Sequence, residues 1–233
     1  DCLQLLLIER DGGAGGGTVF ELAGAVLSFT VFARDYSIPK AIALSVFHAV
    51  SAFNNAGIDI IGAENLIPYA DSITLNIVTA ALIFFGGIGF FVILDVAKNR
   101  KFRKFALQSK VALAVSIVLI IAGTLILMLT DKMNILTAFF LSVSTRTAGF
   151  TTTDLSLVSH GGLFAMCVLM FIGASPGGTG GGIKTTTAFA IITAIKSAAT
   201  NGKQQVFKRK LSNEVIMKAF MVFITGVMTI VIG

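Results

Sequence analysis

Apolar runs of two lengths alternate along the chain. A helix needs about 20 apolar residues to cross a bilayer, and the runs at 73–94 and 111–129 reach that length. Residues 214–233 look like a further spanning helix, and residues 18–33 are short but sufficient with their flanks. A run at 162–199 is also long enough, although a proline and a glycine cluster interrupt it. The pattern predicts several membrane-spanning helices.

Two apolar pieces between these spans, at 41–53 and 134–143, are too short to cross a membrane and suit buried or re-entrant helices. They belong to a repeat, because "AIALSVFHAVSAFNNAGI" aligns with "MNILTAFFLSVSTRTAGF" at an offset of 149 − 57 = 92 residues. At the same offset "GGIG" at 86–89 falls on "GTGG" at 178–181. The predicted unit is a helix, a short pore-type helix, a glycine loop and a second helix, and it occurs about twice.

The composition agrees with membrane helices. Hydrophobic residues make up 55% of the chain and charged residues 13%, and the mean hydropathy is +0.89. A soluble domain has about 45–50% apolar and about 25% charged residues. The sequence therefore predicts an all-α integral membrane protein.

Basic residues gather in two clusters, at 98–110 and 196–210, and each cluster lies between long apolar runs. Most acidic residues lie near the short apolar pieces instead. The positive-inside rule then predicts that both basic clusters face the cytoplasm and that the short pieces lie toward the outer side. This arrangement disfavours a nucleic-acid-binding patch, in spite of the net charge of +6.

The residues that carry enzyme chemistry are sparse. Cys2 and Cys167 form no CxxC pair, and His48 and His160 are isolated. No paired carboxylates, Ser/His/Asp set or metal-ligand cluster is apparent in the sequence. We therefore expect no enzyme activity.

The loops after the two short pieces, "NNAGID" and "TRTAGFT", each contain a glycine, Gly57 and Gly149. Irregular backbone at membrane depth must be buried in protein or line a watery cavity. Carbonyl groups in such a loop can replace the hydration shell of an ion, and glycine permits the backbone angles this requires. One loop alone would be an ordinary turn, but two loops at one spacing predict a pore.

Three stretches together resemble the Trk/Ktr/HKT superfamily of potassium transporters. "SAFNNAGIDI" (51–60) is similar to the second filter loop of that family, and "STRTAGFTTTDLS" (144–156) to the third. "GASPGGTGGGIKTTT" (173–187) resembles the glycine-rich break in the helix after the third filter. The likeness is greatest to the membrane subunit of bacterial Ktr-type systems and extends from about residue 18 to the end.

The resemblance implies a fold of repeated helix–pore-loop–helix units around one ion path, and potassium transport across the plasma (inner) membrane. The carbonyls of two loops would line part of the filter: Asn54, Asn55, Ala56 and Gly57, and Arg146, Thr147, Ala148 and Gly149. The segment 173–187 would be a gate, with Gly173, Ser175, Pro176, Gly177, Gly178, Thr179, Gly180, Gly181, Gly182 and Lys184 as its candidate residues.

A nucleotide-binding loop is the other interpretation of this glycine-rich segment. The phosphate-binding motif requires glycine directly before lysine, and Ile183 stands before Lys184 here. An apolar helix rather than a strand precedes the segment, so we expect a helix broken within the membrane. Lys184 either presents a barrier to cations, or pairs with an acid elsewhere, or reaches the cytoplasmic interface.

Other polar residues near the loops have less specific roles. Arg146 is expected to point away from the path and tie its loop to a neighbour, and the side chains of Asn54 and Asn55 to do the same. Asp59 and Asp154 follow the loops, where they either concentrate cations at the mouth or act as solvated loop acids.

The family has four repeats, so the expected organisation is partial. We expect an uncertain N-terminal segment at 1–17, with a flexible linker at 12–17, and the second repeat at 18–97. A basic cytoplasmic loop at 98–110 precedes the third repeat at 111–200, which contains the gate. Residues 201–233 hold a basic loop and the first helix of the fourth repeat. The first and fourth filter loops are not seen, which predicts a fragment.

The resemblance also implies partners: K+ as the transported ion with Na+ as a candidate activator, membrane lipid, a second copy in a homodimer, and a cytoplasmic ring of nucleotide-binding regulatory subunits. Three alternatives stay open. They are a nucleotide-driven pump, a cation antiporter or another type of sodium/potassium symporter, and a non-transporting scaffold. Coupled transport usually needs acids within spans, for which Asp95 is the only predicted candidate.

Overall fold

The computed structural model describes residues 14–62, 64–200, 205–206, 209–210 and 212–232, and its chain is almost entirely helical. The helices are α2 (Ala14–Phe32), α3 (Ile38–Phe53), α4 (Ile73–Ile88), α5 (Phe90–Asn99), α6 (Leu107–Asp131), α7 (Ile135–Ser144), α8 (His160–Phe171), α9 (Thr185–Thr200) and α10 (Asn213–Ile232). Single 3-10 turns lie at Ile67–Tyr69, Phe102–Lys104 and Leu155–Leu157, and β1 (Gln205–Val206) pairs with β2 (Arg209–Lys210). The predicted all-α class is confirmed.

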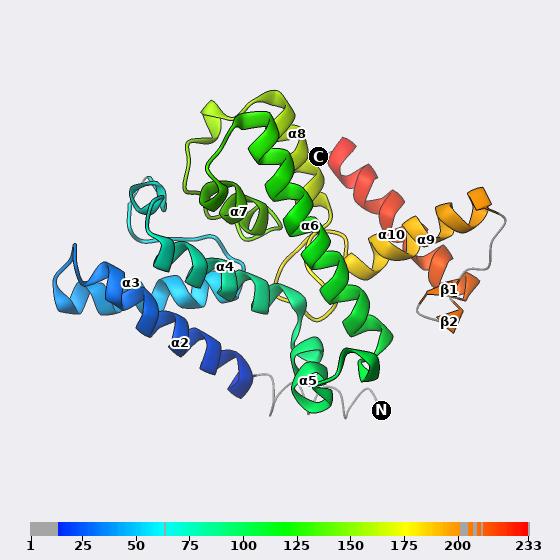
Figure 1. Cartoon of the computed structure of the whole chain (residues 1–233), viewed down its shortest axis with the longest axis horizontal. Coiled ribbons are helices and arrows are strands. Elements are labelled where there is room, and N and C mark those ends of the chain that lie inside the picture. Colours follow the sequence, from blue (N-terminus) through cyan, green and yellow to red (C-terminus); the bar gives the residue numbers. More distant parts are fainter. Residues whose placement is uncertain (1–13, 63, 201–204, 207–208, 211, 233) are drawn as a thin grey trace.

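The helices form two units of the same order. In the first, α2, α3 and α4 pack on one another and lie on one side of the molecule; in the second, α6 packs against α7 and α8 in its middle (Figure 1). Contacts between α4 and α7 join the two units, and α9 and α10 pack together on the other side. The short helices α3 and α7 occupy the places predicted for pore-type helices.

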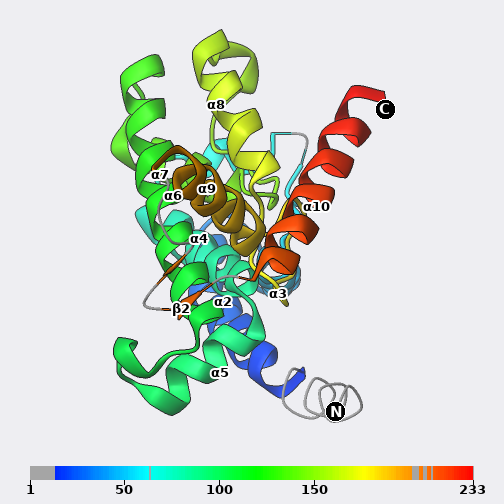
Figure 2. The ribbon, with the colours of Figure 1, turned by 90° about the vertical axis from the view of Figure 1, so that its right-hand side faces the viewer.

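The second helix of each unit is broken at an equivalent place. The run at 73–94 was expected to be one span, but α4 and α5 meet at Gly89 with a bend of 94° (Figures 1 and 2). Gly89 has a φ of +88°, and a β-carbon there would lie 2.7 Å from the Pro176 carbonyl oxygen. The expectation of a continuous helix was wrong, because Pro176, Gly177 and Gly178 of the other unit occupy the space beside Gly89. The break between α8 and α9 lies at the corresponding place in the second unit.

Close helix contacts explain why α2 begins earlier than expected. The linker predicted for 12–17 is wrong over 14–17, which are helical, whereas residues 1–13 lie outside the described part. A β-carbon at Gly16 would lie 2.8 Å from the ring of Phe90, and one at Gly17 would lie 3.1 Å from the ring of Phe53. These glycines allow α2 to approach two aromatic side chains, so tertiary packing outweighs their low helix propensity.

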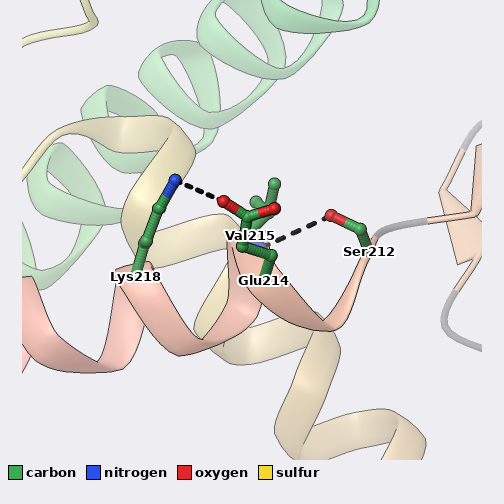
Figure 3. Close-up of polar contacts among 4 residues, drawn as sticks. All are labelled: Ser212, Glu214, Val215 and Lys218. Atoms are coloured by element: carbon green, nitrogen blue, oxygen red, sulfur yellow. Dashed lines mark hydrogen bonds and ion pairs between the residues drawn. The ribbon is translucent and has the colours of Figure 1, made fainter.

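Two described helices, α6 and α10, are long and apolar enough to cross a membrane, and the bent pair α4–α5 makes a third if it is one span. The start of α10 is capped by Ser212, whose hydroxyl accepts from the Val215 amide at 3.4 Å (Figure 3). Lys218 and Glu214 form an exposed ion pair at 2.6 Å in the next turn. Such exposed pairs add little to stability, so the cap defines this helix start better than the pair does.

The glycines at the end of α4 give the first prediction. A β-carbon on Gly86 would lie 1.8 Å from the Phe53 carbonyl oxygen, whereas one on Gly87 would approach only Asn55 Nδ2, at 3.9 Å. We expect Gly86→Ala to destabilise the protein by about 1–3 kcal/mol or more, because backbone would have to move. Gly87→Ala is the matched control and should leave stability unchanged or slightly higher. Thermal unfolding of the purified intact protein, followed by size exclusion, measures the difference; equal melting temperatures would contradict the packing described.

Candidate functional site

The two predicted filter loops share an unusual backbone pattern. In the first loop Asn55 and Gly57 have φ values of +52° and +66°, and in the second Thr147 and Gly149 have +77° and +93°. The residue between each pair has a negative φ. Alternating signs of φ turn successive peptide planes so that neighbouring carbonyls face the same side, as a carbonyl-lined ion site requires. The predicted repeat therefore extends to individual backbone angles.

Thr147 is the outlier in this pattern. Positive φ is tolerated by asparagine but is rare for a β-branched residue such as threonine. Residues held in such conformations cost on the order of 1–3 kcal/mol and cluster at functional sites. The angle at Thr147 thus marks the second loop as a site where backbone geometry matters more than local stability.

The fold brings the two loops into direct contact. A β-carbon on Gly57 would lie 2.2 Å from the Ala148 carbonyl oxygen and 2.9 Å from the Gly149 α-carbon. The backbones of residues 92 positions apart in sequence therefore touch where the two glycines lie. At Gly57 both the φ angle and the lack of space require glycine; at Gly149 the nearest atom to a β-carbon is 3.5 Å away, so the φ angle alone does.

Two serines that the sequence analysis did not single out close these loops. Ser51 Oγ donates to the Ile58 carbonyl and Ser144 Oγ donates to the Phe150 carbonyl, both at 2.6 Å. Each serine lies in the last turn of its short helix, and each acceptor directly follows the loop glycine. A serine at the end of both short helices was the sequence signal that could have revealed this pair.

Three polar side chains of the loops are hydrogen-bonded to other parts of the protein. Arg146 Nη2 donates to Ser116 Oγ and to the Gly173 carbonyl, each at 3.1 Å. Asn54 Nδ2 donates to Glu21 Oε1 at 3.0 Å, and Asn55 Nδ2 donates to Thr179 Oγ1 at 2.7 Å. The expectation that these side chains tie the loops to neighbours is confirmed by these hydrogen bonds.

The glycine-rich segment after α8 is a closed loop. A short parallel bridge between Ile172 and Ile183 joins its two ends, and the Gly173 amide donates to the Ile183 carbonyl at 3.1 Å. Within the loop, Lys184 Nζ donates to the Gly180 carbonyl at 2.9 Å. A helix rather than a strand precedes it, which is the expected break in a helix and lacks the strand that a phosphate-binding loop follows.

This segment lies against both predicted filter loops. Thr179 Oγ1 donates to the Phe53 carbonyl at 2.9 Å, at the start of the first loop. A β-carbon on Gly180 would lie 2.6 Å from Thr147 Oγ1, in the second loop. The Thr179 amide also donates to the Gly86 carbonyl at 3.1 Å, at the break between α4 and α5. All candidate gate residues belong to one segment that contacts the base of both loops.

The acids near the loops have structural roles. Asp59 Oδ1 accepts from the amides of Ile61 and Gly62, and Asp154 Oδ1 accepts from the Ser156 amide at 2.9 Å. The hydrogen bond from Ser156 holds the pKa of Asp154 below its usual value, so this carboxylate stays ionised at neutral pH. Both acids therefore cap turns beside the loops.

Asp95 was expected to be the only acidic residue near a span, which is wrong because Glu21 lies within α2. Asp95 accepts from the Ala106 amide at 2.8 Å and so caps the turn between α5 and α6. Glu21, in contrast, lies within α2 and accepts from Asn54 of the first loop. Glu21 and Asn54 line a cavity of about 420 Å³ together with Thr179 of the glycine segment. The contact between Glu21 and the first loop is visible only in the fold. The sequence of an apolar helix does not show whether a single acidic residue lies on the face that meets a loop.

Comparison with known proteins agrees with this geometry. The family described as a cation transport protein, TrkH, matches residues 19–130 and again residues 105–233. The chain belongs to this family. It is 36% identical over 219 residues to the potassium/sodium uptake protein NtpJ of Enterococcus hirae, covering 88% of this chain and 48% of that protein. Ktr system potassium uptake protein B of Bacillus subtilis is 33% identical over 227 residues, covering 91% of this chain and 51% of the relative.

A solved structure shares the fold. The crystal structure of the potassium transporter TrkH from Vibrio parahaemolyticus superposes with a TM-score of 0.69 at 19% identity, covering 88% of this chain and 45% of that one. The chain spans about half the length of the relatives it matches. The predicted architecture of repeated helix–pore-loop–helix units is therefore confirmed at the level of the fold and the family.

The hydrogen bonds that Ser51 and Ser144 donate to the ends of the two loops give the second prediction. Removing the Ser144 hydroxyl leaves the buried Phe150 carbonyl without this donor, which costs about 1–3 kcal/mol. We expect Ser144→Ala to lower the stability of the purified intact protein by this amount, and Ser51→Ala to lower it by less, because Ile58 is exposed. Ser37→Ala is the control, because Ser37 precedes α3 and makes no side-chain cap hydrogen bond. Wild-type stability in both test variants would show that the hydroxyls do not hold the loops.

Proposed function

We propose that this protein transports potassium ions across the plasma membrane through a filter lined by backbone carbonyls. The observation that carries the proposal is the paired pattern of φ angles at Asn55, Gly57, Thr147 and Gly149, in two loops that touch. Carbonyl groups with a common direction replace the hydration shell of a potassium ion. Membership of a family of cation transport proteins, and relatives named for potassium uptake, support the same ion.

Residues 54–57 and 146–149 would form two sides of the filter. The side chains of Asn54, Asn55 and Arg146 are hydrogen-bonded to protein groups, which leaves the backbone carbonyls of the two loops for the ion. In this family four loops form one filter, so the proposed ion path needs two loops in addition to residues 54–57 and 146–149. K+ is the proposed cargo, and Na+ is a candidate activator.

The segment 173–187 would act as the gate. It contacts the base of both loops through Thr179 and Gly180, so an ion leaving the filter would meet it. Pro176 lacks an amide hydrogen and prevents a continuous helix through this depth. Lys184 Nζ donates to the Gly180 carbonyl, so the ammonium group lies within the segment. Its positive charge would oppose the passage of cations while the segment is in place.

The proposed orientation in the membrane and the proposed partners follow from the charge clusters and the family resemblance. The basic clusters at 98–110 and 196–210 would face the cytoplasm. They would bind a cytoplasmic ring of nucleotide-binding regulatory subunits or anionic lipid headgroups. The membrane subunit would function as a homodimer.

Coupled transport, by a cation antiporter or a sodium/potassium symporter of another type, is the second candidate, and Glu21 is the observation that favours it. A carboxylate in an apolar helix that contacts the proposed filter loop can carry coupled charge. Glu21→Gln separates the candidates, because glutamine keeps the oxygen that accepts from Asn54 but cannot ionise. For uncoupled flux we expect uptake by the variant to stay within about twofold of wild type, since only one side-chain charge is lost. Loss of uptake, with normal expression and a normal melting temperature, would instead support coupling.

The proposed function is tested by rubidium uptake into potassium-depleted cells that carry the intact gene. Wild type should take up rubidium, and Gly149→Ser should weaken the preference for rubidium over sodium, since a side chain at a φ of +93° forces the loop to move. We expect selectivity to fall by about tenfold or more, the change that follows from about 1.4 kcal/mol of lost discrimination.

Gly161→Ser is the matched control, because a β-carbon there meets only ordinary contacts, the nearest at 3.6 Å from Thr130 Cγ2. This control should behave as wild type. Absence of uptake in wild type would overturn the transport proposal. Uptake that is indifferent to Gly149→Ser at equal expression would overturn the filter assignment.

A further inference from the structure

The second filter loop is seated on a hydrophobic core that the first unit mainly supplies. Phe150, which directly follows Gly149, is only 2% exposed and belongs to a cluster built mainly from α2, α3 and α4. The separate cluster of the second unit, formed around Leu127 and Leu141, does not include it. The position of the second loop therefore depends on what Phe150 meets in the first unit.

Phe150 meets the ring of His48. His48 is on the short helix α3, is 2% exposed, and its ring centroid lies 5.1 Å from that of Phe150 at an interplanar angle of 59°. Phe32, at the end of α2, contacts the same imidazole edge-on at 5.8 Å. A histidine is thus enclosed between two phenylalanines at the joint between the units, where an apolar residue would ordinarily be expected.

Hydrogen bonds determine which imidazole nitrogen carries the proton. His48 Nε2 lies 2.7 Å from Thr79 Oγ1, and the same hydroxyl donates to the Leu75 carbonyl at 2.8 Å. A hydroxyl has only one hydrogen, so Thr79 must accept from His48 Nε2–H. Among the described residues, Nδ1 has no partner, so it carries the lone pair of a neutral ring. The bond to Thr79 also fixes the rotation of the ring.

We propose that His48 is a positioning residue that holds the second filter loop in register with the first. Thr79 orients the imidazole, the imidazole supports the ring of Phe150, and the Phe150 carbonyl accepts from Ser144. The backbone between Ser144 and Phe150 includes Gly149, which contacts Gly57. This inference rests on the proposed function, since its consequence is selectivity.

The repeat itself indicates the informative substitution. At the offset of 92 residues, position 48 corresponds to Phe140, which is fully buried in the second short helix. Phenylalanine therefore suits a short helix of this kind, and His48→Phe keeps an aromatic ring of similar size. It removes the hydrogen bond that fixes the ring and adds a small volume, which Thr79→Val does not.

The test measures rubidium uptake and its inhibition by sodium, with the intact gene in potassium-depleted cells. We expect His48→Phe and Thr79→Val to lower the preference for rubidium over sodium by about 2- to 10-fold, the range that one lost hydrogen bond accounts for. The double variant should be no worse than the more severe single variant, because both changes break the same link. Thr79→Ser keeps the hydroxyl, and His160→Phe alters the exposed histidine at the start of α8, so both should match wild type.

The outcomes separate this inference from the proposed function. If wild type takes up no rubidium, the proposed function fails and the inference falls with it. If wild type is selective and His48→Phe and Thr79→Val are equally selective at normal expression, the positioning role alone is wrong. A merely structural role predicts lower expression or melting temperature with unchanged selectivity, which also contradicts the inference. Should His48→Phe fail to fold, the contrast between Thr79→Val and Thr79→Ser still decides.

Discussion

Peptide groups that leave a helix inside a membrane need hydrogen-bond partners within the protein, because the hydrocarbon offers none. Three irregular segments of this chain meet that requirement together. The amides of Ala56 and Ala148 donate back to the ends of their own short helices, at 2.9 Å each. In the glycine segment at 173–184, the amides of Ser175 and Thr179 donate to the carbonyls of Gly87 and Gly86, which α4 frees where it ends. The breaks in the two units therefore satisfy part of each other's hydrogen bonding.

The glycines of the segment at 173–184 allow close packing of backbone against backbone, rather than flexibility. The segment is packed and hydrogen-bonded on several sides. A β-carbon on Gly178 would lie 2.4 Å from the Gly87 carbonyl oxygen, and one on Gly173 would lie 2.0 Å from that of Gly181. Only Gly177 and Gly182 in this segment have positive φ values. Any movement of the segment as a gate must therefore exchange specific backbone contacts, and its rest position is well defined.

The two proposed filter loops and the glycine segment form one connected structure. Arg146 extends from the second loop to Gly173, and Thr179 extends from the glycine segment to the first loop. His48 adds a third connection, from the core of the first unit to the second loop. Because each link joins parts that lie far apart in sequence, neither loop has its geometry from local sequence alone, and a change at the glycine segment reaches both loops through hydrogen bonds.

The sequence by itself determined the class of protein, the repeat and the place of the two loops, since hydropathy, glycine position and charge clusters are local signals. It also located the break after α8, because Pro176 and the glycines mark it directly. It did not reveal the 94° bend at Gly89, the helical start of α2 at Ala14, or the contacts of Glu21 and His48. Only the tertiary structure decided these. Each depends on a group from a distant part of the chain that fills a space or accepts a hydrogen bond, and no local pattern specifies which distant group that is.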